Sequence, residues 1–166
     1  EELNKFSKEI TEESIVDEDL KTILKSFPKT AHPMGVLSSL TSALIAFNPV
    51  AVNVDSDAEM RFAVVKLMAK FPILASWTHR KGKGLPLNYA DTKLSYVENL
   101  ASMMFKRPND VYTQSPVVVN ALNKLLILHA DHEQNCSTST VRIVGSSHAG
   151  LFASVSAGIS ALWGPL

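Results

Sequence analysis

The sequence has little of what marks a secreted or a strongly charged protein. It contains a single cysteine, Cys136, so no internal disulfide can form, and this scarcity fits a reducing compartment. Sixteen basic residues balance sixteen acidic ones, so no overall field attracts nucleic acid or an anionic membrane. The start of the chain lacks the basic and apolar segments of a signal or transit peptide. These absences predict a cytoplasmic protein whose partners are small molecules or proteins.

Long apolar runs are also scarce. Two stretches without charge, 36–54 and 149–166, approach the length of a membrane span. The first is interrupted by Asn48 and Pro49, and the second consists largely of Ala, Ser and Gly, which insert poorly into lipid. We therefore expect buried helices and no membrane contact.

The apolar residues that are present recur at intervals of three and four, and almost no segment alternates as a half-buried strand does. This periodicity predicts an all-α fold. Proline at position 33 or 116 suits the first turn of a helix, whereas Pro28 and Pro49 end one. The predicted helices cover residues 17–27, 33–47, 57–80, 95–105, 116–128 and 153–162.

Two of these segments raise functional questions. The helix over 33–47 is apolar around much of its circumference, which predicts an interface between subunits, with burial inside one subunit as the alternative. The lysines and glycines after residue 80 predict a solvated loop. Arg80, Lys81 and Lys83 in that loop could instead cradle a phosphate, although the spacing of a phosphate-binding loop is absent.

The richest chemistry lies where an apolar helix meets a polar cluster, between residues 125 and 142. We expect Leu125 to Leu128 to anchor this junction in the core. His129, His132, Asn135 and Ser137 then supply titratable groups and hydrogen bonds within a few turns, which is typical of a site for a polar ligand.

Other interpretations of the same junction remain open. His129, His132 and Glu133 would share one face if the helix continued, as in a metal site, but no second ligand cluster is visible. Cys136 or Ser137 could act as a nucleophile beside a histidine, yet the sequence context of a nucleophile elbow is missing.

The density of this segment points to a family. The runs His129-Ala-Asp-His-Glu-Gln-Asn135 and Ser137-Thr-Ser-Thr-Val-Arg142 closely resemble bacterial citrate synthases. The resemblance continues through Val144-Gly-Ser-Ser147 to Trp163-Gly-Pro-Leu166. Upstream, His32-Pro-Met34 and Lys70-Phe-Pro72 also fall in the family's order.

The resemblance implies roles for single residues. His132 would bind oxaloacetate and polarise its ketone, with Asn135 as a second substrate-binding residue. His129 and Ser137 would support the site, with Ser137 bonded to a catalytic histidine. That histidine and the catalytic aspartate are expected beyond Leu166, so the resemblance places no catalytic residue, metal or cofactor within this chain.

At the level of the whole protein, the resemblance implies a citrate synthase that condenses acetyl-CoA with oxaloacetate, and a homodimer. Residues 1–166 would be part of its large helical domain, without the small CoA-binding domain, and inactive alone. A 2-methylcitrate synthase and a non-catalytic helical dimerisation module are the alternatives.

Overall fold

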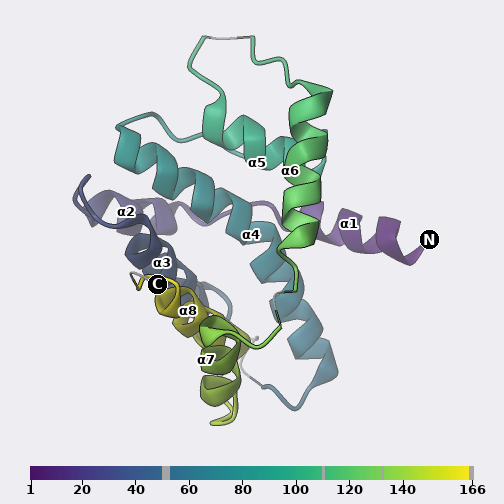
Figure 1. The fold of residues 1–166 in the computed structure, drawn as a ribbon, viewed down its shortest axis with the longest axis vertical. Coiled ribbons are helices and arrows are strands. Elements are labelled where there is room, and N and C mark those ends of the chain that lie inside the picture. The colour runs from purple at the N-terminus through teal and green to yellow at the C-terminus, as the bar shows by residue number, and fades with distance from the viewer. Residues whose placement is uncertain (50–52, 110, 132, 165–166) are drawn as a thin grey trace.

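A computed structural model describes residues 1–49, 53–109, 111–131 and 133–164, and within these ranges it contains helices and turns but no strand (Figure 1). The predicted all-α fold is therefore confirmed. The helices are α1 (Glu2–Glu12), α2 (Glu18–Ser26), α3 (Pro33–Phe47), α4 (Asp57–Lys83), α5 (Tyr96–Phe105), α6 (Pro116–Leu128), α7 (Cys136–Gly145) and α8 (Leu151–Ala161).

Local chemistry explains where the predicted helices begin and end. Proline occupies the first turn of both α3 and α6, where its missing N–H costs no helical hydrogen bond. Ser95 and Glu98 form a reciprocal capping box at the start of α5. The helices predicted over 33–47 and 116–128 consequently have the observed bounds.

The loop predicted from residue 80 is wrong, because α4 continues through Lys83 and ends at Gly84 in the left-handed conformation (φ 68°). The Arg80 side chain is fully buried. It donates hydrogen bonds to the carbonyls of Pro86, Met104 (3.0 Å) and Lys106 (2.9 Å). Arg80 therefore fastens the end of α4 to the end of α5 and does not face a phosphate.

Two helices, α1 and α7, were not predicted from the sequence. In α1 only Ile10 is buried, and with Phe6 it packs on Val65 and Ala69 of α4. One buried residue leaves a weak apolar pattern. Helix α7 is rich in serine and threonine, which favour turns and caps in isolation, and its side chains are at most partly buried.

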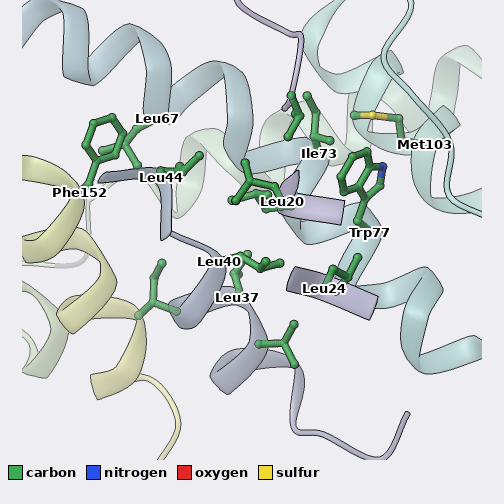
Figure 2. Packing of buried hydrophobic residues seen from close by; sticks show 14 of the residues in the cluster. Leu20, Leu24, Leu37, Leu40, Leu44, Leu67, Ile73, Trp77, Met103 and Phe152 are labelled. Carbon is green, nitrogen blue, oxygen red and sulfur yellow. The ribbon is translucent and has the colours of Figure 1, made fainter. Parts of the chain in front are cut away.

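The main core lies where α2, α3, α4 and α8 meet, and Figure 2 shows its leucines converging with Trp77 and Phe152. Most of the apolar side chains of α3 are buried or partly buried inside the chain, as in the alternative that we left open, and the subunit interface stays a prediction. Within the described ranges, no helix has the length and apolar character needed to cross a bilayer.

Helix α8 is fastened to α3 by serine hydroxyl groups. Ser38 Oγ donates to Ser156 O (2.9 Å), and Ser156 Oγ donates back to Ser38 O (2.8 Å). Ser160 Oγ lies 2.6 Å from Ser38 Oγ. Small side chains allow the two helix backbones to approach closely, and Figure 1 shows α8 beside α3 with α7 against it. The position of α7 therefore depends on α8.

Candidate functional site

The polar junction predicted from the sequence forms an exposed connection between α6 and α7, called the α6–α7 turn (residues 129–135). Helix α6 ends at Leu128, and His129 follows as its C-cap. His129 Nδ1 lies 2.7 Å from Leu125 O, so the imidazole closes the last turn of α6. The supporting role that the resemblance implies for His129 stays a prediction.

A hydrogen bond to the Asp131 side chain stabilises the bend at Glu133. Glu133 has a positive φ of 60°, an unusual conformation for a residue other than glycine. Its N–H donates to Asp131 Oδ1 (2.9 Å), which stabilises the bend. His132 lies outside the described residues.

The end of the turn is fixed by Asn135. Its Oδ1 accepts hydrogen bonds from the Thr138 N–H (2.9 Å), as an N-cap does, and from Ser137 Oγ (2.7 Å). Gln134 Nε2 adds a bond to Ser139 Oγ (2.7 Å). Asn135 and Ser137, predicted as a substrate-binding and a supporting residue, are thus brought together at the start of α7.

The prediction that Leu125 to Leu128 anchor the junction in the core is wrong. These four side chains are 43–68% exposed, and none of the α6 residues is buried. The physical reason is that, among the described helices, α6 packs mainly against α5. The described chain therefore offers the junction little apolar support from this side.

The geometry also bears on the other interpretations. Because α6 ends at Leu128, the helical spacing that would align His129 with Glu133 is not realised. In the described part of the chain, no three His, Cys, Asp or Glu side chains are grouped as a metal site requires. The Ser137 hydroxyl donates to the Asn135 amide oxygen, which cannot act as a general base. Neither metal binding nor a serine nucleophile is supported.

A hollow of about 730 Å³ lies elsewhere, between α1, α4, α5 and α6. Its walls are mainly apolar and include Phe6, Pro72 and Met103. None of the described residues of this region, 129–131 and 133–137, lines it. It is therefore a separate feature from the α6–α7 turn.

Sequence reasoning missed one residue that underlies the site, Gly158 on α8. It is buried beneath α7, next to Val141 and the backbone of Ser137. The signal available was a glycine inside an otherwise helical segment, which often marks a close approach of two backbones.

Comparison with known proteins is consistent across sequence and structure. Residues 1–166 match the family described as citrate synthase, C-terminal domain. The chain is 48% identical over 165 residues to the citrate synthase of Corynebacterium glutamicum and 47% identical to citrate synthase 1 of Mycobacterium tuberculosis. Each alignment covers 99% of this chain and 38% of the relative.

The solved structures agree with this. The crystal structure of citrate synthase from Pyrobaculum aerophilum is similar with a TM-score of 0.85 at 27% identity, over 98% of this chain and 41% of that one. The chain thus spans about two fifths of the length of the proteins it matches. Since the family match covers every residue, the chain belongs to the citrate synthase family.

Proposed function

We propose that the protein carrying this chain is a transferase that condenses acetyl-CoA with oxaloacetate to give citrate and CoA. The observation that carries the proposal is the 48% identity over 165 residues to a citrate synthase. The chain corresponds to part of the large helical domain, without the small CoA-binding domain. Because it spans only 38% of that relative, it has no synthase activity on its own.

The α6–α7 turn is the proposed oxaloacetate site, with His132 and Asn135 as binding residues. An imidazole that donates to the keto oxygen would make the adjacent carbon more electrophilic and stabilise the negative charge that develops there. The start of α7 carries the positive end of a helix dipole, which suits a dicarboxylate. The His129 contact and the Asn135 cap fix the two ends of the turn to α6 and α7.

Ser137 is a supporting residue in this proposal. Its hydroxyl donates to Asn135 Oδ1 and keeps a lone pair free to accept one further hydrogen bond. That lone pair can receive an N–H from a catalytic histidine, which the family resemblance expects beyond Leu166. The catalytic histidine and aspartate are therefore not assigned to residues of this chain.

Two broader properties belong to the same proposal. The protein works in the cytoplasm, in keeping with its lone cysteine, and it forms a homodimer through α3 and α4. Phe62, Val64 and Met68 of α4, together with Ile45 of α3, remain 37–40% exposed. Apolar side chains of this kind suit a subunit contact. Light scattering of the complete protein should give twice the mass of one chain.

Isothermal titration of oxaloacetate into the complete protein tests the binding site. The wild type should bind saturably, and His132→Ala should weaken binding at least about tenfold, since a lost hydrogen bond to a charged ligand costs roughly 1.5–3 kcal/mol. The control is His148→Ala, an exposed histidine at the far end of α7, which should bind as the wild type does. Equal weakening in both variants would contradict the assignment.

A thiol-release assay tests the reaction. The complete protein should release CoA from acetyl-CoA only when oxaloacetate is present, whereas residues 1–166 alone should not exceed the blank. Turnover by residues 1–166 would contradict the proposed inactivity of this chain. Absence of turnover in the complete protein would contradict the function itself.

A further inference from the structure

Helix α8 passes directly beneath the first turn of α7, and the point of closest approach is Gly158. A Cβ atom at this position would lie 2.6 Å from Val141 Cγ2 and 3.5 Å from Ser137 O. The first distance is far below van der Waals contact, and the second is an ordinary contact. The missing side chain of Gly158 is therefore what allows the two helices to lie at this separation.

The obstacle that a Cβ would meet is a stiff one. Val141 is β-branched, and on a helix such a side chain has one strongly preferred rotamer. Turning its methyl group aside would force an unfavourable conformation against the preceding turn of α7. An added side chain at position 158 therefore has to displace α7 itself.

Helix α8 cannot move away from α7 instead, because hydrogen bonds to α3 hold its opposite face. Ser38 and Ser156 exchange two hydrogen bonds of 2.9 and 2.8 Å between α3 and α8. Both residues are buried, so breaking these bonds would leave polar groups without water. The displacement must therefore appear on the α7 side.

The first turn of α7 is where the proposed ligand-binding groups are fixed. Ser137 lies above Gly158, and its hydroxyl donates to Asn135 Oδ1. The same oxygen accepts the Thr138 N–H. A movement of α7 at Ser137 is thus passed to Asn135 through two hydrogen bonds.

We propose that Gly158 is a positioning residue for oxaloacetate: because it has no side chain, α7 can pack closely on α8, and this packing places Asn135 for the ligand and Ser137 for its supporting contact. This inference rests on the proposed function of the α6–α7 turn. Gly158 acts through α7 and does not touch the ligand.

The test uses the complete protein and a compensating pair of substitutions. Gly158→Ala should raise the dissociation constant for oxaloacetate at least about tenfold, because a displaced Asn135 would lose its hydrogen bond to a charged ligand. Val141→Ala alone should change it less than about threefold. The double variant should return to within about threefold of the wild type, because the clashing methyl is gone and the new Cβ keeps only its ordinary contact with Ser137 O.

A second readout separates this inference from the identity of the ligand. Without ligand, hydrogen exchange at the Thr138 and Ser139 amides should be faster in Gly158→Ala and restored in the double variant, because both amides donate to Asn135. Gly82→Ala is the matched control, since no atom lies within 4 Å of a Cβ there. It should leave both binding and exchange unchanged.

The outcomes distinguish the two proposals. Unchanged exchange and binding in Gly158→Ala, or a defect that Val141→Ala does not rescue, overturns the role of Gly158. If Gly158→Ala fails to fold, the double variant must fold and bind, and an unfolded double variant overturns the role as well. If the wild type binds no oxaloacetate but hydrogen exchange responds as described, the proposed function and the ligand named here are overturned. The role of Gly158 in positioning α7 is then still supported.

Discussion

Replacing Arg80 by methionine should strongly destabilise the fold. The methionine side chain can occupy much of the buried volume but donates no hydrogen bond. In the native structure the guanidinium joins the last turn of α4 to carbonyls at the end of α5. The substitution therefore removes a polar connection while leaving the apolar packing largely filled.

The magnitude follows from the partners. A hydrogen bond from a charged donor contributes about 1.5–3 kcal/mol. Met104 O loses its bond from Arg80, whereas Lys106 O keeps a second donor, Asn88 Nδ2, at 3.0 Å. We expect a loss of about 3 kcal/mol in the free energy of unfolding, which for a chain of this size lowers Tm by roughly 6–12 °C.

Urea unfolding followed by the fluorescence of the buried Trp77 measures this loss. Arg80→Lys should be intermediate, because one ammonium cannot reach all three carbonyls. Lys81→Met is the control: Lys81 Nζ bonds Lys25 O at the surface (2.9 Å), and its removal should cost less than about 0.5 kcal/mol. A loss below about 1 kcal/mol for Arg80→Met would refute the reasoning.

Two further predictions concern single side chains. Burial lowers the pKa of Lys70 from 10.5 to about 8, and the nearby charge of Lys66 contributes to this shift. Between about pH 8 and pH 10.5 the folded state therefore binds fewer protons than the unfolded chain. The free energy of unfolding should rise with pH over this interval. Urea midpoints should show this rise in the wild type and not in Lys70→Met, and equal slopes would contradict it. Alanine is favoured over glycine in a helix by about 1 kcal/mol, so Gly82→Ala in α4, where a Cβ meets no atom within 4 Å, should raise Tm. Gly35→Ala in α3 should raise Tm less, because its Cβ would lie 3.1 Å from the Trp163 ring, which stacks on His32 and would have to shift. Equal Tm values in both variants would refute the clash.

The helices that could be predicted from the sequence are those whose signals are local. Proline at the first turn, a capping serine and a strong apolar period are sufficient to identify α3, α5 and α6. Helix α7 could not be found in this way, because its stability comes from packing on α8 and not from its own Ser- and Thr-rich sequence. The end of α4 was missed because two of the carbonyls that Arg80 binds lie at the end of α5, far from α4 in sequence.

The candidate site was predicted in its residues but not in its support. The polar types between His129 and Ser137 pointed to a binding site, and the structure brings Asn135 and Ser137 into contact. The expected apolar anchor at Leu125 to Leu128 is exposed, since periodicity shows that a helix is apolar without showing what covers it. The residue that positions the start of α7, Gly158, has no side chain and therefore contributes almost no hydrophobic pattern to the sequence.

The hydroxyl contacts between α3 and α8 also have a consequence for how the protein is made. Ser38 and Ser156 are separated by 118 positions in the chain, and contacts this distant form late because a long loop must first be closed. During synthesis, α8 must therefore emerge from the ribosome before α7 can pack against it. Among the described helices, we therefore expect the α6–α7 turn to acquire order after the core between α2, α3 and α4 can assemble.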